Sequence, residues 1–192
     1  MWFAAEEGES MPYGWLTGLL LLVSLAGCFS GGGGGAPASR LEQGMDFPAL
    51  VMRDLSGGVV DSGTLLRGKV VVFNVWATWC PPCRKEMPDL IALSKRLPRK
   101  DFAVVGLSVD ESLQQLQQFI ERHGVSFPVF WDPGGRAIAA DRLTVFKYPE
   151  TFILNRQGTV VARVIGGYPW NAEETVRALH YIAEHGTLPE DS

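Results

Sequence analysis

Hydrophobic and polar positions alternate in blocks between residues 45 and 188, and these blocks predict a series of strands and helices. Residues 70–76 (VVVFNVW) form an almost continuous apolar run rich in β-branched side chains, which is typical of a strand buried on both faces. Residues 102–108 predict a second buried strand for the same reason. Two antiparallel hairpins are predicted where apolar runs flank turn residues, at 47–54 with 59–60 and at 151–154 with 160–165.

An apolar stripe at helical spacing over residues 82–97 predicts a helix directly after the first buried strand. Pro88 lies inside this helix and should kink it, because proline removes a hydrogen bond and clashes with the preceding turn. Strand, helix, strand, helix, hairpin and helix then follow one another along the chain. This order predicts an α/β fold in which a mixed sheet carries helices on both faces.

Capping residues indicate where two later helices begin. Ser112 with Gln115 forms a capping box for a helix that ends near Gly124. Asn171 with Glu174 forms a second capping box, for the final helix. The helices expected in this half of the chain cover residues 112–124, 136–142 and 171–184.

The N-terminal segment is typical of a targeting signal. Trp15 to Gly27 is an uncharged apolar run of 13 residues, shorter than the ~20 that span a membrane as a helix. It ends in the sequence LAGC, which resembles a bacterial lipobox and implies lipidation of Cys28, with residues 1–28 as a lipoprotein signal. The acidic start of the chain departs from this pattern and is explained if translation begins at Met11. The alternative is a buried helix that ends in an ordinary cysteine.

Residues 29–44 are expected to form a flexible linker, because they contain five consecutive glycines and cannot build a core. Residues 45–188 then form the folded domain. The chain has 192 residues, a net charge of −4 and scattered basic residues. A nucleic-acid partner is therefore not expected, since phosphate binding needs clustered Lys and Arg on one face.

Two of the three cysteines, Cys80 and Cys83, form a Cys-x-x-Cys sequence where the helix over 82–97 begins. A disulfide that closes so short a loop adds little stability, so the pair is expected to be chemical. The helix N-terminus stabilises a thiolate on Cys80, whereas Pro82 removes one backbone donor. We therefore expect Cys80 to be the nucleophile of a reductant and Cys83, one turn deeper, to be the resolving thiol.

Glu86 lies one helical turn beyond Cys83. If burial raises the pKa of its carboxyl group, Glu86 can accept the proton that Cys83 must lose. The alternative is a surface glutamate that merely complements the helix dipole in the first turn.

Residues 73–88 (FNVWATWCPPCRKEMP) are similar to the active-site segment of the TlpA/ResA/CcmG group of extracytoplasmic thioredoxin-like proteins. The resemblance extends over most of residues 45–185, including an added helix and strand near residues 113–130. It implies a thioredoxin fold with a central mixed β-sheet flanked by helices, an N-terminal β-hairpin and a central αβ insertion. It also implies a reversible Cys80–Cys83 disulfide and a proton-accepting role for Glu86.

The sequence Tyr148-Pro149-Glu150 resembles the cis-proline loop that faces the cysteines in this group. A cis Pro149 would leave a backbone edge to which an extended substrate can pair. The role of Glu150 stays open between substrate contact and an ordinary strand start. Trp76 is expected in the core, and Trp131 and Trp170 are assigned to packing. The expected substrate-binding surface comprises Trp79, Pro81, Pro82, Tyr148, Pro149 and Glu150.

The resemblance implies a lipid-anchored, extracytoplasmic protein that reduces disulfides of other proteins, for example those of apocytochrome c in c-type cytochrome maturation. It implies electrons from a membrane partner of the CcdA or DsbD type. No cofactor is expected.

Other functions remain as alternatives. They are thiol oxidation or isomerisation, peroxide reduction, metal or copper delivery, and thiol binding without turnover. A zinc site would need two further ligands near the cysteines, and the three histidines show no ligand spacing to one another. A copper site of a related kind would have Cys-x-x-x-Cys, one residue longer than the spacing here. A peroxidatic cysteine would follow a Thr-x-x pattern, but Thr78 precedes Cys80 by only two positions.

Overall fold

The computed structural model of the chain describes residues 40–190. The predicted signal segment, the lipidation of Cys28 and most of the predicted linker lie outside these residues. Within residues 40–190, no helix is both long enough and apolar enough to cross a membrane.

The described residues form one seven-stranded sheet in the order β2-β1-β5-β4-β3-β6-β7. Strands β3, β4 and β5 run parallel to one another, and the other pairs are antiparallel, so the sheet is mixed as predicted. The strands are β1 (Val51–Asp54), β2 (Val59–Asp61), β3 (Val70–Trp76), β4 (Phe102–Ser108), β5 (Val129–Trp131), β6 (Glu150–Leu154) and β7 (Val160–Ile165).

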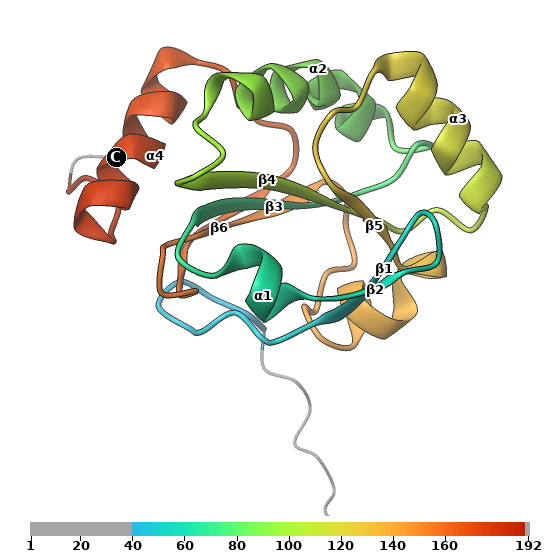
Figure 1. Cartoon of the computed structure of the whole chain (residues 1–192), viewed down its shortest axis with the longest axis horizontal. Coiled ribbons are helices and arrows are strands. Elements are labelled where there is room, and N and C mark those ends of the chain that lie inside the picture. Colours follow the sequence, from blue (N-terminus) through green and yellow to red (C-terminus); the bar gives the residue numbers. More distant parts are fainter. Residues whose placement is uncertain (1–39, 191–192) are drawn as a thin grey trace, which may run out of the picture. The chain divides into compact units, whose positions relative to one another are not determined.

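Helices cover both faces of the sheet, with α2, α3 and α4 on one face and α1 and η2 on the other (Figure 1). Two of these segments were not predicted in their observed form. Helix α1 follows the N-terminal hairpin directly, and the short helix expected at 136–142 is a π-helical segment preceded by a 3-10 turn. The helices are α1 (Ser62–Leu66), α2 (Pro81–Arg96), α3 (Leu113–His123), η1 (Pro133–Gly135), η2 (Arg136–Ala140) and α4 (Glu173–His185).

The two predicted capping boxes have different outcomes. Ser112 caps α3 as expected, since its side chain accepts a hydrogen bond from the backbone N–H of Gln115 at 3.3 Å. The cap predicted at Asn171 is wrong, because Ala172 occupies the N-cap position of α4 and Asn171 Oδ1 is buried without a hydrogen-bond partner. The preceding residue, Trp170, is buried and bonded elsewhere in the domain, and this tertiary contact sets how the chain enters α4.

Strand β3 lies at the centre of the core, and all seven of its residues are buried. Trp76, at its end, is fully buried as expected and packs on Phe119 of α3, with ring centroids 5.4 Å apart. Gly106 of the neighbouring strand makes room for the indole, because a Cβ there would lie 2.8 Å from Trp76 Nε1. The packing of the central strands therefore fixes the end of β3, from which the chain enters the segment with the cysteines.

Candidate active site

Cys80 occupies the N-cap position of α2 and is joined to Cys83 in the expected disulfide. Both residues are almost completely buried, and the backbone N–H of Cys83 donates to Cys80 Sγ at 3.3 Å. Pro81 and Pro82 occupy the intervening positions and have no N–H group. The first turn of the helix therefore offers the Cys80 sulfur one backbone donor, together with the positive end of the helix dipole.

The turn that carries the chain from β3 to Cys80 is held by a buried carboxylate. Asp110 accepts hydrogen bonds from the Thr78 hydroxyl at 2.6 Å and from the Thr78 backbone N–H at 3.0 Å. The Ser108 hydroxyl also donates to Asp110, and the indole N–H of Trp131 donates to its backbone carbonyl at 2.6 Å. Trp131 therefore supports this turn, beyond the packing expected from the sequence.

Glu86 lies on α2 one turn beyond Cys83, and its side chain is buried with a 4 % exposed fraction. Asn74 Nδ2 of β3 donates to Oε1 at 2.9 Å. The indole N–H of Trp170 and the backbone N–H of Tyr168 donate to Oε2 at 2.9 and 3.1 Å. A buried carboxyl group is thus held by three donors from two distant parts of the chain.

Burial raises the pKa of the Glu86 carboxyl group above its ordinary value of 4.5. The hydrogen bonds from Trp170, Asn74 and Tyr168 favour the charged form and lower the pKa, but burial has the larger effect. A carboxylate in this environment takes up a proton at a higher pH than an exposed one. The direction of the shift agrees with the expectation for a proton acceptor beside the dithiol.

We expect Glu86→Gln to stabilise the disulfide form at neutral pH. The raised pKa means that the native state binds this proton more tightly than the unfolded state, so stability falls as pH rises from 4.5 through the folded-state pKa. The variant has no ionisable group at this position and so does not lose this stability. At pH 7 its Tm should exceed that of the parent chain, and the difference in Tm should shrink as the pH approaches 4.5. Thermal unfolding across this pH range checks the result, and a margin independent of pH would contradict it.

Sequence reasoning missed the residues that surround Glu86. Asn74 donates to both Glu86 and Thr151, and Trp170, assigned to packing alone, donates to the carboxylate. Asn74 had a recognisable signal, because it is the one polar residue in the otherwise apolar run 70–76. Thr151, Tyr168 and Trp170 had none, since only tertiary packing brings them to α2.

The Tyr148–Pro149 peptide bond is cis, as the family resemblance implied. The Tyr148 ring lies against exposed Trp79 with centroids 5.8 Å apart, which places the loop beside the Cys80 segment. Among residues 40–190, neither the backbone N–H nor the backbone C=O of Tyr148 has a hydrogen-bond partner. These groups leave a short stretch of backbone available for pairing with an extended chain.

Glu150 is placed differently from the rest of the expected substrate-binding surface. Its side chain is buried and forms an ion pair with Arg163 of β7. Arg163 also donates to the backbone carbonyl of Leu41 at 2.7 Å. The pair therefore ties the start of the described chain to the sheet, and Glu150, with a 3 % exposed fraction, presents almost no surface to a substrate.

Within the described part of the chain, no group of three or more His, Cys, Asp or Glu side chains is arranged to hold a metal ion. Each histidine instead packs on an aromatic ring. The pairs are His123 with Phe119, His180 with Phe102 and His185 with Tyr181.

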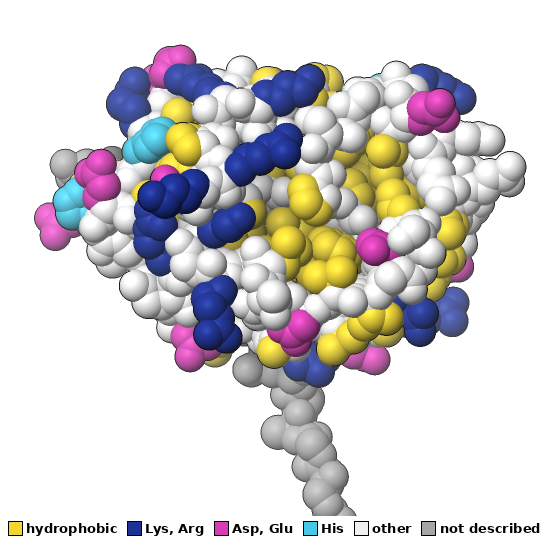
Figure 2. All heavy atoms as spheres, viewed as in Figure 1, with side chains coloured by type: hydrophobic (Ala, Val, Ile, Leu, Met, Phe, Trp, Pro, Cys, Tyr) yellow, Lys and Arg dark blue, Asp and Glu magenta, His cyan; other side chains and the backbone are white. Residues whose placement is uncertain are grey.

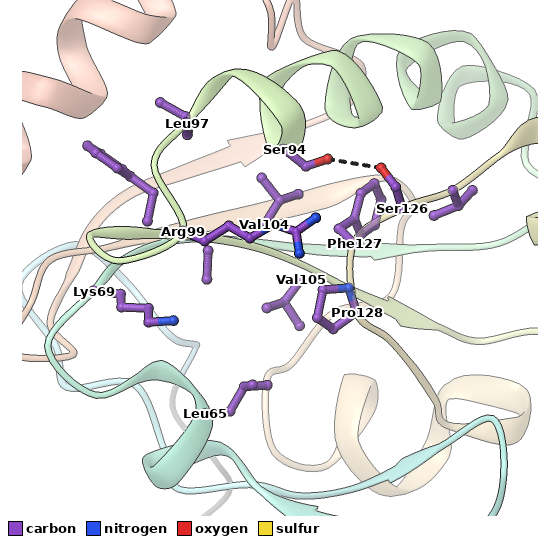
Figure 3. Close-up of a pocket in the computed structure, with 13 residues that line it drawn as sticks. Leu65, Lys69, Ser94, Leu97, Arg99, Val104, Val105, Ser126, Phe127 and Pro128 are labelled. Atoms are coloured by element: carbon purple, nitrogen blue, oxygen red, sulfur yellow. Dashed lines mark hydrogen bonds between the residues drawn. The ribbon is translucent and has the colours of Figure 1, made fainter.

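A separate groove of about 410 Å³ lies between the C-terminal part of α2, the first half of β4 and α1 (Figure 3). Its walls are largely apolar, and Lys69 and Arg99 are its charged residues. Apolar side chains gather in a hollow on this face, with Lys and Arg side chains beside it (Figure 2). The groove contains neither cysteine and contributes no group to the redox site.

Comparison with known proteins agrees with this fold and with a thiol–disulfide oxidoreductase. The profile of the AhpC/TSA family matches residues 43–163. The thiol-disulfide oxidoreductase ResA of Bacillus thuringiensis is 32 % identical over 148 residues, covering 77 % of this chain and 84 % of the relative. ResA of Bacillus subtilis is 34 % identical over 131 residues, covering 68 % of this chain and 72 % of the relative.

A solved structure supports the same assignment. The crystal structure of a putative thiol:disulfide interchange protein DsbE from Chlorobium tepidum superimposes with a TM-score of 0.65 at 26 % identity, covering 74 % of this chain and 98 % of that one. The fold and the paired cysteines define a thioredoxin-like thiol–disulfide oxidoreductase. The chain belongs to the AhpC/TSA family, and the relatives that it matches include ResA thiol-disulfide oxidoreductases.

Proposed function

We propose that this protein is a membrane-tethered reductase of disulfides in extracytoplasmic proteins. The observation that carries the direction is the single backbone donor to Cys80 Sγ, the N–H of Cys83. Strong thiol oxidants stabilise their reduced form, and with it the thiolate, most strongly. With two prolines in the first turn of α2, the stabilisation here is moderate and favours a dithiol that gives its electrons away.

The proposed reaction begins with the reduced dithiol. The Cys80 thiolate attacks one sulfur of the client disulfide, which breaks the client S–S bond and forms a mixed disulfide. The Cys83 thiolate then attacks Cys80 Sγ and displaces the client sulfur. Two electrons pass to the client, which leaves as a dithiol after taking up protons, and the Cys80–Cys83 disulfide forms.

Cys83 must lose a proton before it can attack, and it is completely buried. Glu86 lies one turn further along the same helix and has a raised pKa, so it is the group proposed to accept that proton. Its burial supports the role, because a carboxylate with a higher pKa is a better match to a thiol.

The client is proposed to bind over Trp79, Pro81, Pro82 and the cis-proline loop. Trp79 has a 60 % exposed fraction although Ala77 and Cys80, on either side of it in the chain, belong to the core, and Tyr168 is also exposed. Exposed aromatic rings beside a buried disulfide suit an unfolded polypeptide, which offers apolar side chains and a free backbone.

We expect Trp79→Ala to weaken binding of protein clients more than it slows the chemistry. The variant removes an exposed ring and leaves the N-cap geometry of Cys80 in place. The KM for insulin, measured by following the reduction of its disulfides, should rise several-fold. The rate with glutathione disulfide should change little. Equal losses with both substrates would show that the ring acts on the cysteines instead.

The location and partners are part of the same proposal. The LAGC sequence supports a lipid anchor at Cys28 on the extracytoplasmic side of a bacterial membrane. A dithiol in an oxidising compartment must be re-reduced, which supports a membrane electron donor of the CcdA or DsbD type. Disulfides of apocytochrome c are the proposed example of a client.

A redox titration of the full chain against glutathione and dithiothreitol tests the direction. A reduction potential near the thioredoxin value of about −270 mV supports a reductase. A potential near the DsbA value of about −120 mV would identify an oxidase. Turnover with hydrogen peroxide should be negligible beside insulin reduction. Rapid peroxide turnover would replace this proposal with the peroxidase alternative.

A further inference from the structure

Glu86 is held on its two oxygens by different kinds of group. Oε2 accepts hydrogen bonds from the indole N–H of Trp170 and the backbone N–H of Tyr168. Both groups are donors only, whatever the protonation state of Glu86. Oε2 must therefore remain an acceptor when the carboxyl group is neutral, and a proton taken up by Glu86 resides on Oε1.

Oε1 faces the side-chain amide of Asn74. Nδ2 uses its two hydrogens to donate to Glu86 Oε1 at 2.9 Å and to Thr151 Oγ1 at 2.8 Å. The opposite end of the same amide, Oδ1, is buried and has no hydrogen-bond partner, in a residue with no exposed surface. A buried acceptor without a donor is rare in proteins and calls for a physical explanation.

Protonation of Oε1 would place its hydrogen against a hydrogen of Nδ2. The oxygen and nitrogen of an amide are nearly equal in size, so a half-turn about the Cβ–Cγ bond exchanges them within the same cavity. After the turn, Oδ1 accepts from Glu86 Oε1 with one lone pair and from the Thr151 hydroxyl with the other. Thr151 can follow, because a hydroxyl group both donates and accepts.

We propose that Asn74 is a positioning residue whose side-chain amide turns over when Glu86 takes up a proton, presenting NH₂ to the carboxylate and oxygen to the carboxylic acid. In each protonation state one end of the amide is then bonded and the other is buried without a partner, Oδ1 when Glu86 is charged and Nδ2 when it is neutral. Glu86 stays bonded on both oxygens in both states and does not move as its charge changes. The inference rests on the proposed function in one respect, that the proton comes from Cys83.

The turn of the amide can be observed by NMR on the full chain with isotopic labelling in the disulfide form. The Asn74 NH₂ group lies next to Thr151 when Glu86 is charged, so a strong nuclear Overhauser effect to the Thr151 methyl group is expected at high pH. The effect should weaken as Glu86 titrates. In Glu86→Gln it should be weak at every pH, because the new amide offers an N–H where the acid has its O–H.

The opposite result is equally clear. An Overhauser effect of constant strength through the Glu86 titration, and unchanged in Glu86→Gln, would overturn the proposal and leave Asn74 as a fixed donor. The titration of Glu86 itself is followed by its carboxyl ¹³C shift in the same samples. This shift shows that Glu86 has titrated in the pH range used, even if the Overhauser effect does not change.

Kinetics give a second readout. Asn74→Leu should lower kcat for disulfide reduction by about tenfold and leave KM nearly unchanged. This loss is a part of the roughly 10²–10⁴-fold that proton transfer by a positioned group contributes to a rate. Its pH profile should move to higher pH, because the charged form of Glu86 loses a donor. Ser62→Ala is the control, since it removes a different buried polar group, the hydroxyl that accepts from the Leu50 N–H, outside this network.

The control should lower Tm without moving the pH profile. If Asn74→Leu and Ser62→Ala change kcat and the profile alike, a positioning role is excluded. If the parent chain reduces disulfides but the amide does not turn, this inference alone fails. If the parent chain shows no Cys80-dependent reduction, the proposed function fails, while the NMR result still decides whether the amide follows the proton.

Discussion

Cys80→Ser is expected to abolish disulfide reduction, with a loss of several orders of magnitude in kcat/KM. Cys80 is the sulfur at the N-cap of α2, where the Cys83 N–H and the helix dipole favour a negative charge. A serine hydroxyl in the same place is not ionised and cannot form a mixed disulfide. The measurement is the rate of insulin or glutathione-disulfide reduction by the pre-reduced chain.

Cys28→Ser provides the matched control, because it also removes one thiol but is no part of the Cys-x-x-Cys sequence. It should retain the reductase rate in solution and lose attachment to membranes if the anchor is as proposed. Substantial reduction by Cys80→Ser would show that Cys83 or another group attacks the client, and the order of events in the proposed reaction would then be wrong.

Cys83→Ser is expected to lose turnover as well, but to accumulate covalent complexes with its clients. Cys80 can still attack a client disulfide, whereas the sulfur that would displace the client is missing. Cys83 is completely buried, and among residues 40–190 there is no third cysteine to take its place. Non-reducing electrophoresis of the membrane fraction should show adducts that dithiothreitol releases.

The contrast between the two cysteine variants carries the assignment of roles. Cys80→Ser should form no adducts under the same conditions, and the double variant should resemble it. Adducts on Cys80→Ser and none on Cys83→Ser would reverse the nucleophile and the resolving thiol. Mass spectrometry of released clients from Cys83→Ser would also identify the proteins on which this chain acts.

Most of the fold could be predicted because its strongest signals are local. Strands β3 and β4 have the predicted bounds, since a run of β-branched apolar residues is favourable only where both faces are buried. The cap at Ser112 was predictable for the same reason, because its bond is to a residue three positions away. Helix α1 was missed although its cap is equally local, since the Asp61 side chain accepts from the Thr64 N–H. The start of α4 was not predictable in this way, because Trp170 just before it is held by the distant Glu86.

The amino-acid sequence by itself determined the cysteine pair at a helix N-terminus and the buried central strands, whereas the cis proline was expected from the family resemblance. These features depend on neighbouring residues, whose spacing fixes hydrogen bonds and backbone conformation. Only the tertiary structure decided the surroundings of Glu86 and the burial of Glu150. Packing of distant segments brings Asn74, Thr151 and Trp170 together around one carboxyl group, and its desolvation and hydrogen bonds exist only once those segments meet.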